Sequence, residues 1–438
     1  MPKIPSFTKI TGKIILPGDK SISHRAIMFS SITKGSTRIL NFLHSQDTLA
    51  TLQAFRKLGV KISYDRKKKK VLVRGKGKFL KSRGKILDMK ESGTTIRIIS
   101  GLLAAQRFKT TLKASFGLSR RPMKRITLPL RLMGADIKGR SKGDNEYPPL
   151  EIRPVTMLKA INYKLPVASA QVKSSLFLAG LYAEGKTIIR EPYKSRDHTE
   201  RMLKIFKADI KMKAKSTVVK DSELASPGEI FIPSDFSSAS YFIALGLLSK
   251  NSRFLLKKVG INPTRTGFLR VLKRMGAKIR FTNIKKSYFE PYADILVEAS
   301  PLKAAIVKEG QIPLMIDEVP LLFAVAAFAE GTTRIYGLKE LKVKETDRIR
   351  SMEHNLRKAG VDFKVSRYRN HQGQRDFMVT IKGPAKFKSA EIKSFQDHRT
   401  AMSLIIANLS QGFEARIDNI SCISKSLPEF LSILRHLA

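Results

Sequence analysis

Long apolar segments recur along this chain, and several are too uniformly hydrophobic to be half-exposed surface helices. Segments 176–183, 242–248, 321–329 and 402–409 would be apolar on every side of a helix. A helix that is hydrophobic all round is buried. We therefore predict a family of buried helices. Its members begin near Ser21, Gly93, Ala170, Ser237, Asp317 and His398.

A second pattern alternates with the first: a helix-like stretch that ends in glycine and leads into a short strand. It occurs at 58–62, 133–137, 275–279 and 359–363, with a copy that lacks glycine at 207–210. The copies lie about 70–85 residues apart, and a regular spacing of this kind indicates an internal repeat. We expect each glycine to follow a helix C-terminus at positive φ, which glycine adopts without a steric penalty.

The repeat also predicts the domain organisation. A sixth copy would fall beyond residue 438, so we expect the N-terminal segment to supply the missing strand and both termini to share one domain. Leu-Pro-Gly-Asp-Lys-Ser at 16–21 is similar to Ile-Pro-Ser-Asp-Phe-Ser at 232–237, three periods later. This predicts an α/β protein of two halves, each with three repeats, joined by a hinge. The predicted domains are 1–18 with 237–438, and 19–236, with the hinge near 18–20 and 234–237.

The composition narrows the functional classes. The chain has 438 residues, a formal net charge of +47 and a single cysteine, Cys422. One cysteine excludes an internal disulfide framework and a thiolate zinc site. No apolar run reaches the roughly 18 residues of a membrane span. Residues 1–5 lack the apolar core of a signal peptide, so we expect a cytoplasmic protein.

The positive charge raises the alternative of a basic nucleic-acid-binding protein. Against this alternative, Lys and Arg are spread along the whole chain, and only residues 66–70, Arg-Lys-Lys-Lys-Lys, form a run. That run lies between two strand-like stretches, which predicts an exposed hairpin. No zinc-finger or RNA-binding motif occurs. A generally Lys-rich surface explains the charge as well, and it would attract an anionic small substrate.

The segment 14–29 is the first candidate for chemistry. An apolar strand leads into Pro17 and Gly18, and then Lys20, Ser21 and Arg25 stand at the start of a small-residue helix. The first turn of a helix presents unpaired backbone N–H groups, so cations there create an anion site. On this stretch alone, an ordinary capped helix with a solvated lysine fits equally well.

Similar polar groups stand at equivalent points of the other repeats, and this recurrence favours a function. At the starts of buried helices they are Gly93-Thr94-Thr95-Ile96-Arg97, Ser169-Ala170-Gln171-Val172-Lys173, Asp317-Glu318 and Asp397-His398-Arg399. At the starts of outer helices they are Arg120-Arg121-Pro122, Arg196-Asp197-His198, Lys344-Glu345-Thr346-Asp347-Arg348 and Lys425. Any one group could be structural, and Asp317 could simply cap its helix. Repeat symmetry would aim all of them at one cleft suited to phosphates and carboxylates.

These motifs resemble the 5-enolpyruvylshikimate-3-phosphate synthases (3-phosphoshikimate 1-carboxyvinyltransferases), a family of enolpyruvyl transferases. The resemblance covers nearly the whole chain. It rests on Gly18-Asp19-Lys20-Ser21-Ile22-Ser23-His24-Arg25, Ser92-Gly93-Thr94-Thr95-Ile96-Arg97, Arg121-Pro122-Met123, Ser169-Ala170-Gln171, Lys344-Glu345-Thr346-Asp347-Arg348 and Asp397-His398-Arg399. It implies a two-domain fold, each domain having three βαβαββ repeats around buried helices, an inside-out α/β barrel.

The resemblance also implies the reaction. The enolpyruvyl group of phosphoenolpyruvate passes to the 5-hydroxyl of shikimate 3-phosphate, with release of phosphate, in the shikimate pathway of aromatic amino acid biosynthesis. It implies no metal and no organic cofactor, no nucleic-acid or membrane partner, and a monomer.

Residue roles follow from the same resemblance. Asp317 and Glu345 are the acid/base carboxylates, and Lys20 bridges both substrates; which carboxylate moves which proton stays open. Shikimate 3-phosphate is held by Lys20, Ser21, Arg25, Ser169, Ala170, Gln171, Arg196, Asp317 and Lys344. Phosphoenolpyruvate is held by Lys20, Gly93, Arg121, Gln171, Arg348, Arg399 and Lys425. Gly93 is expected to offer its backbone N–H with no side chain in the way.

Four short patterns further resemble the glyphosate-tolerant class (class II) of the family. They are Gly18-Asp19-Lys20, Ser169-Ala170-Gln171-Val172-Lys173, Arg196-Asp197-His198-Thr199-Glu200 and Asn262-Pro263-Thr264-Arg265. Gly93 argues against the tolerant class, since a strongly glyphosate-tolerant member of the family has alanine at this position. The rival enzyme family transfers enolpyruvyl to a UDP-sugar and carries a cysteine before the Arg-Pro of its loop. Residues 114–119 contain no cysteine, and Cys422 is far along the chain.

Overall fold

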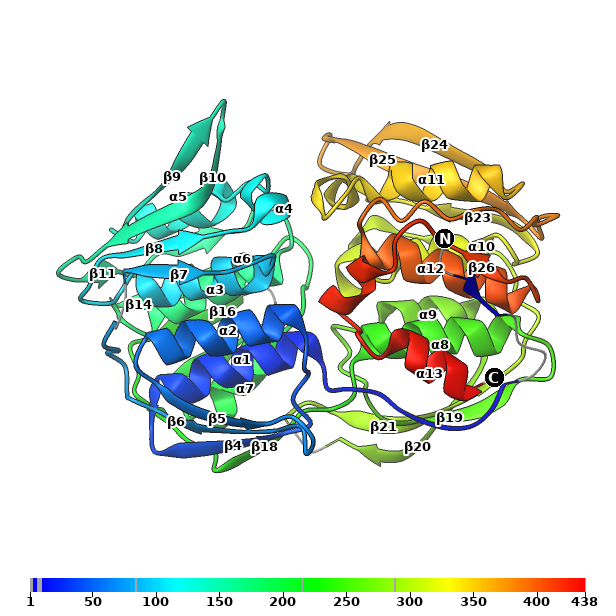
Figure 1. Cartoon of the computed structure of the whole chain (residues 1–438). Coiled ribbons are helices and arrows are strands. Elements are labelled where there is room, and N and C mark those ends of the chain that lie inside the picture. Colours follow the sequence, from blue (N-terminus) through cyan, green and yellow to red (C-terminus); the bar gives the residue numbers. More distant parts are fainter. Residues whose placement is uncertain (1–2, 6–9, 83–84, 215, 287–288, 438) are drawn as a thin grey trace. The chain divides into compact units, whose positions relative to one another are not determined.

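The computed structural model describes residues 3–5, 10–82, 85–214, 216–286 and 289–437 (Figure 1). The chain forms two compact units: unit 1 contains Met1–Leu16 and Pro233–Ala438, and unit 2 contains Pro17–Ile232. The predicted boundaries after residue 18 and before residue 237 lie a few residues from these. Residues 1–2 and 6–9 of the predicted first domain lie outside the described residues. The hinge stays a prediction.

Unit 2 contains three similar layers of helix and sheet around buried helices (Figure 1). The inner helices are α1 (Lys20–Ser31), α3 (Gly93–Leu103) and α6 (Ala170–Gly180), and the outer helices are α2 (Gln46–Lys57), α5 (Lys124–Leu132) and α7 (His198–Ile205). A short helix, α4 (Phe116–Ser119), precedes α5. The sheets have the orders β18-β4-β6-β5, β7-β8-β10-β9 and β12-β14-β16-β15.

The strands of unit 2 have the same pairing pattern in all three sheets. Each sheet begins with a parallel pair, and its other two pairs are antiparallel. The predicted βαβαββ repeat is therefore confirmed. The strands are β4 (Ser36–Leu40), β5 (Lys61–Asp65), β6 (Lys70–Arg74), β7 (Ile86–Asp88), β8 (Thr110–Lys113), β9 (Asp136–Lys142), β10 (Asn145–Arg153), β12 (Asn162–Lys164), β14 (Lys186–Arg190), β15 (Ile210–Met212), β16 (Ser216–Lys220) and β18 (Glu229–Phe231). The short pairs are β3 (Thr33–Lys34) with β17 (Leu224–Ala225) and β11 (Leu158–Lys159) with β13 (Ala183–Glu184).

Unit 1 repeats this plan with inner helices α8 (Phe236–Leu248), α10 (Val319–Ala326) and α12 (His398–Ser410). Its outer helices are α9 (Gly267–Arg274), α11 (Arg348–Lys358) and α13 (Phe430–Leu437), and its short 3-10 helices are η1 (Glu309–Leu314), η2 (Lys339–Val343) and η3 (Ser421–Lys425). One sheet joins β2 (Thr11–Ile15), β19 (Arg253–Gly260), β21 (Tyr292–Glu298) and β20 (Lys278–Lys285) in that order. The next joins β22 (Ile306–Val307), β23 (Gly331–Ile335), β25 (Arg375–Gly383) and β24 (Asp362–Arg369).

The third sheet of unit 1 is reduced to β1 (Lys3–Ile4) paired with β26 (Ala415–Arg416). The N-terminal segment therefore contributes a strand to this incomplete repeat and a second one, β2, beside β19. As predicted from the missing sixth copy, an N-terminal strand completes the pairing there.

The glycines that end the helices have the predicted conformation. Gly59, Gly134, Gly276 and Gly360 have φ of 83°, 89°, 94° and 86°. In the copy without glycine, Lys207 takes this place at φ 63°, which side chains adopt at a cost. All five copies of the pattern therefore share a residue with positive φ directly after the helix.

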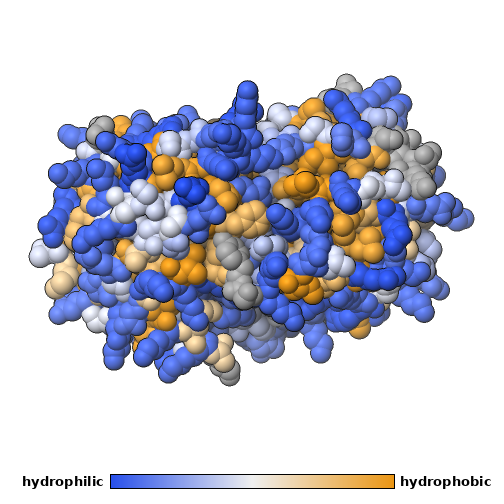
Figure 2. Space-filling model, turned by 90° about the horizontal axis from the view of Figure 1, so that it is seen from below, coloured by the Kyte–Doolittle hydropathy of each residue, from blue (hydrophilic) through white to orange (hydrophobic). Residues whose placement is uncertain are grey.

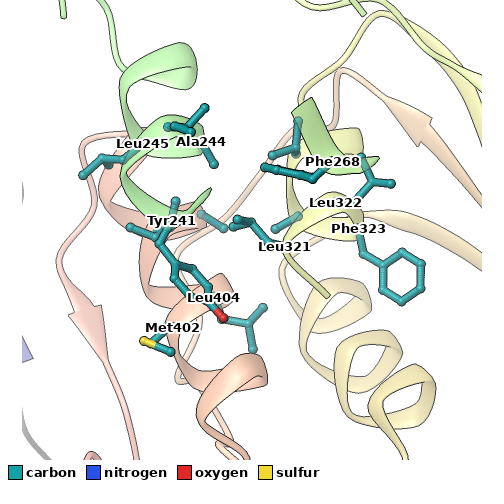
Figure 3. Packing of buried hydrophobic residues seen from close by; sticks show 14 of the residues in the cluster. Tyr241, Ala244, Leu245, Phe268, Leu321, Leu322, Phe323, Met402 and Leu404 are labelled. Carbon is teal, nitrogen blue, oxygen red and sulfur yellow. The ribbon is translucent and has the colours of Figure 1, made fainter. Parts of the chain in front are cut away.

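The inner helices bury nearly every residue, as their all-round apolarity predicted. In unit 1, Tyr241 of α8, Leu321 of α10 and Leu404 of α12 converge from three helices (Figure 3). In unit 2, α3 and α6 approach so closely that a Cβ on Gly101 would lie 1.8 Å from the carbonyl oxygen of Ser175. Two segments end earlier than expected: α6 stops at Gly180 and α10 at Ala326.

On the face that Figure 2 displays, hydrophilic residues cover most of the surface, and hydrophobic residues form several patches among them. Residues 66–69 of the basic run form the turn between β5 and β6, and residue 70 is the first residue of β6. The two strands are paired antiparallel, so the predicted hairpin is confirmed. Within the described ranges, no helix is long and apolar enough to cross a membrane.

Candidate active site

Lys20 and Arg25 project from the first two turns of α1 in unit 2. Asp19 caps this helix by accepting a hydrogen bond from the Ile22 N–H at 2.9 Å. The Lys20 ammonium lies 2.5 Å from a carboxylate oxygen of Asp47, at the start of α2. Asp47 was not among the predicted site residues. It compensates the charge of Lys20 at a position where little solvent reaches either side chain.

Arg25 is buried between three helices. Its Nε donates to the Thr199 hydroxyl of α7 at 2.7 Å, and its Nη2 donates to the Ser174 hydroxyl of α6 at 2.8 Å. Its Nη1 donates to the Ser21 carbonyl at 3.0 Å. The two hydroxyls and the carbonyl hold the guanidinium in one orientation, and a fixed guanidinium suits an anion-binding role.

Gly93, Arg121 and Gln171, predicted to contact phosphoenolpyruvate, lie around one further cation, Arg97. A Cβ on Gly93 would lie 3.0 Å from Nη1 of both Arg97 and Arg121. Arg97 Nη1 donates to Gln171 Oε1 at 3.0 Å, and Gln171 Nε2 donates to the Thr94 hydroxyl at 3.1 Å. Arg97 stood in a recurring motif but was given no role.

The Gly93 N–H, expected to be offered to substrate, donates to the Glu91 carbonyl at 3.0 Å in this structure. Its role toward substrate stays a prediction. The missing side chain leaves room for two guanidinium groups, because a Cβ at this position would lie 3.0 Å from Nη1 of both Arg97 and Arg121.

The start of α6 is tied to the start of α7 by a buried charge cluster. Ser169 caps α6 and Ala170 is its first residue. The Lys173 ammonium lies 2.8 Å from a carboxylate oxygen of Glu191 and 2.7 Å from one of Glu200. The side chains of Lys173 and Glu200 are 1% and 0% exposed. Arg196 lies on the segment between the two glutamates. The cluster therefore holds together the elements that carry Ser169, Gln171 and Arg196.

This cluster holds one positive and two negative groups. Burial lowers the pKa of Lys173, but the fields of Glu200 and Glu191 outweigh it and raise that pKa overall. Burial, together with the negative charges of Glu191 and Asp197, raises the pKa of Glu200 against the lowering effect of Lys173, so the net shift of that carboxyl is upward. Sequence reasoning quoted Lys173 and Glu200 within patterns but missed their contact.

In unit 1, Arg348 gathers both predicted acid/base carboxylates. Its Nη2 lies 2.5 Å from Glu345, its Nη1 3.4 Å from Asp317 and its Nε 2.9 Å from Asp397. Burial lowers the pKa of Arg348, but Asp397, Glu345 and Asp317 together raise it well above its usual range. Asp397 also caps α12 by accepting the Arg399 N–H at 2.7 Å. Its role was missed, although its place before His398 was noted.

Arg399 lies on the other side of Asp317, with Nη2 3.8 Å from that carboxylate. Burial raises the pKa of Tyr241 to about 12, so this phenol beside Arg399 stays protonated. The alternative that Asp317 only caps its helix is wrong, because Glu318 occupies the N-cap position of α10. Asp317 precedes the helix and is 21% exposed at its side chain.

The remaining predicted residues occupy the ends of short elements. Lys344 follows η2 directly, and Lys425 is the last residue of η3. The structure thus places the predicted residues in two groups. Unit 2 carries Lys20, Ser21, Arg25, Gly93, Arg121, Ser169, Ala170, Gln171 and Arg196; unit 1 carries Asp317, Lys344, Glu345, Arg348, Arg399 and Lys425. Among the described residues, no cluster of His, Cys, Asp and Glu is arranged to hold a metal ion.

Comparison with known proteins gives the same family throughout. The 3-phosphoshikimate 1-carboxyvinyltransferase of Thermodesulfovibrio yellowstonii is 46% identical over 432 residues, covering 98% of this chain and 97% of the relative. That of Bacillus subtilis is 42% identical over 429 residues, covering 98% and 97%.

Solved structures agree. EPSP synthase from Acinetobacter baumannii superposes with a TM-score of 0.85 at 41% identity, covering 100% of this chain and 98% of that one. An enolpyruvyl transferase from Streptomyces tendae shares the fold, with a TM-score of 0.76 at 16% identity over 99% and 96% of the chains. Residues 5–434 match the family described as EPSP synthase (3-phosphoshikimate 1-carboxyvinyltransferase), and the chain therefore belongs to that family.

Proposed function

We propose that this chain transfers the enolpyruvyl group of phosphoenolpyruvate to the 5-hydroxyl of shikimate 3-phosphate and releases phosphate. The observation that carries this function is the arrangement around Arg348, whose guanidinium contacts Asp317 and Glu345 at 3.4 Å and 2.5 Å. A buried cation that holds two partly exposed carboxylates fits a reaction needing both anion binding and proton transfer.

The chemistry explains these residue types. A proton adds to the methylene carbon of phosphoenolpyruvate, which gives cationic character at C2. The 5-oxygen then forms a bond to C2 and loses its proton. Finally the bond between C2 and the phosphate oxygen breaks, and the methyl group gives up a proton as the double bond returns. The addition step needs a proton donor and a proton acceptor, for which we propose Asp317 and Glu345, with Lys20 beside both substrates.

The binding roles are part of the same proposal. For shikimate 3-phosphate, the proposed contacts are Lys20, Ser21, Arg25, Ser169, Ala170, Gln171, Arg196, Asp317 and Lys344. For phosphoenolpyruvate, they are Lys20, Gly93, Arg121, Gln171, Arg348, Arg399 and Lys425. Support comes from the fixed guanidinium of Arg25 and from the cluster of Arg97, Arg121 and Gln171 around Gly93.

We further propose a glyphosate-tolerant, class II enzyme that acts as a monomer in the cytoplasm, without a nucleic-acid or membrane partner. The four class patterns support the subtype, and three of them contribute residues to two buried ion pairs: Lys173 with Glu200, and Arg265 with Glu318. Such pairs hold the elements that carry the proposed binding residues of each unit, and in this proposal tolerance depends on how those elements are held, since small shifts alter charge-assisted contacts.

Release of inorganic phosphate tests the function. Phosphate should appear from phosphoenolpyruvate only when shikimate 3-phosphate is added, and a UDP-sugar should not replace it. Release that depends on the UDP-sugar would instead support the rival transferase family. Binding of random DNA tighter than about 1 µM, weakening steeply with salt and without any phosphate release, would support the nucleic-acid-binding alternative.

A further inference from the structure

The pattern Asn262-Pro263-Thr264-Arg265 has no place in the proposed reaction, yet it forms a tightly braced turn between β19 and α9. The Asn262 Oδ1 accepts hydrogen bonds from the Thr264 N–H and hydroxyl, both at 2.9 Å. The Asn262 amide donates to Glu290 at 2.9 Å, and the Thr266 hydroxyl donates to the Asn262 carbonyl at 3.2 Å. Side-chain bonds of this kind fix a turn. The turn therefore presents the next side chain, Arg265, in one direction.

Arg265 reaches a carboxylate on a different element. Its Nη1 lies 3.0 Å and 3.2 Å from the two oxygens of Glu318, which precedes α10. The Ser237 hydroxyl of α8 completes a triangle, accepting from Arg265 and donating to Glu318. Arg265 and Glu318 are 3% and 1% exposed, so the pair is shielded from solvent and from salt.

Glu318 occupies the N-cap position of α10, but its side chain makes no capping bond. Instead its carboxylate is committed to Arg265, while its carbonyl accepts the Leu322 N–H that begins the helix. The orientation of this one residue therefore links the turn at 262–265 to the start of α10. Asp317 is its direct neighbour in the chain.

A second contact anchors the same segment. A Cβ on Gly267, the first residue of α9, would lie 3.0–3.1 Å from Leu314, at the end of η1. A side chain at this position would therefore push against Leu314. The segment 314–318 is therefore held at both ends by the stretch 265–267.

The carboxylate of Asp317 lies beside two guanidiniums. Its oxygens are 3.4 Å from Arg348 and 3.8 Å from Arg399. Because Asp317 is joined directly to Glu318, a shift of Glu318 would change the distance from this carboxylate to both guanidiniums.

We propose that Arg265 is a positioning residue, which fixes Asp317 for proton transfer by clamping Glu318. This inference rests on the proposed function, because it assigns Asp317 a catalytic role. The Asn-x-Thr-Arg pattern then has a physical reason: the first three residues build the turn, and the arginine fork grips the residue beside the acid/base group.

The test compares Arg265→Gln and Arg265→Lys with a matched control, Arg131→Gln. Arg131 also contacts one carboxylate with two nitrogens, at 2.5 Å and 3.1 Å from Glu146, but this pair joins α5 to β10 within unit 2, whereas Asp317 belongs to unit 1. Turnover is measured by phosphate release per folded molecule, well below each melting temperature. The pH profile of kcat is recorded alongside.

We expect Arg265→Gln to lower kcat about tenfold or more, since a displacement near 1 Å can cost about a hundredfold. The acidic limb of its pH profile should shift, and the KM values should change much less than kcat. Arg265→Lys keeps the charge without the fork and should recover only part of kcat. The control should lose melting temperature alone.

Wild-type kcat in both folded Arg265 variants would overturn the inference, however much stability they lose. If Arg265→Gln does not fold, Arg265→Lys decides: reduced kcat with an altered profile supports positioning, and wild-type values refute it. An inactive wild-type enzyme would refute the proposed function itself, which separates the two failures.

Discussion

Lys173→Met should expose how much the buried cluster of α6 and α7 contributes to unit 2. The change removes the single cation and leaves Glu191 and Glu200 facing each other with little solvent. Breaking a buried pair by removing one partner costs about 3–5 kcal/mol, because a charge stays buried without compensation. For a unit of this size, each kcal/mol lowers the melting temperature by about 2–4 °C. We therefore expect a fall of about 6–20 °C.

The loss should depend on pH with a definite sign. The pKa of Glu200 is already raised by burial, and Lys173 is the group that lowers it. Without Lys173 this pKa rises further. A carboxyl whose folded pKa is raised contributes stability that is present below its unfolded pKa and lost as pH rises through the folded pKa. The gap between wild type and variant should therefore widen from pH 5.5 to pH 8.5. Lys173, whose own pKa is raised, stays charged over this range in the wild type.

Urea unfolding at the two pH values measures the gap, and two further variants make it specific. Lys220→Met breaks an exposed pair with Asp209, whose side chains are 40% and 42% accessible, and should cost at most about 1 kcal/mol. Lys173→Met combined with Glu200→Gln removes one of the two stranded charges and should recover part of the loss. A gap below about 1 kcal/mol that does not grow with pH would refute a buried, charged cluster.

The remaining predictions concern turnover. Lys20→Met should nearly abolish phosphate release in a folded enzyme, since each charge-assisted contact is worth about 1.5–3 kcal/mol and the proposed function places Lys20 against both substrates; near-normal turnover would remove it from the mechanism. Asp317→Ala should lower kcat about 10²–10⁴-fold with a smaller effect on binding; a variant that only melts earlier would show a structural role. Gly93→Ala should weaken phosphoenolpyruvate binding and raise glyphosate tolerance, because the new Cβ lies 3.0 Å from Arg97 and Arg121. Glyphosate inhibition near the KM for phosphoenolpyruvate measures it, and binding much tighter than that of phosphoenolpyruvate in the parent enzyme would contradict the tolerant class.

The repeat could be predicted from the sequence because it depends on local sequence patterns. Apolar periodicity and the glycines at the helix ends act over a few residues, so the inner helices and the positions of Gly59 and Gly360 were predictable. At Lys207 the same backbone conformation persists without its usual residue. The geometry of the repeat sets this conformation even where the residue is not glycine. In the sequence, this copy can be recognised only by its spacing from the others.

The partners of the site residues could not be predicted in the same way. Asp47 reaches Lys20, and Asp397 reaches Arg348, across separations of 27 and 49 residues along the chain. Such contacts depend on how helices rotate and pack, which periodicity does not specify. Asp397 did carry a usable signal, since it stands before a helix start at a repeat-equivalent point. Glu191 carried none, because it lies in a loop without a motif.

The arrangement around Arg348 also suggests why a pair of carboxylates can handle protons near neutral pH. An ordinary carboxyl with a pKa near 4 is a poor proton donor there. Arg348 contacts Asp317, Glu345 and Asp397 at once, so the three carboxylates share one guanidinium. In the proposed function, phosphoenolpyruvate brings further negative charge to Arg348. Like charge favours the protonated form of a neighbouring carboxyl. In that proposal the bound substrate competes with the carboxylates for the one guanidinium, and Asp317 and Glu345 are the partly exposed members of the group that can exchange a proton with it.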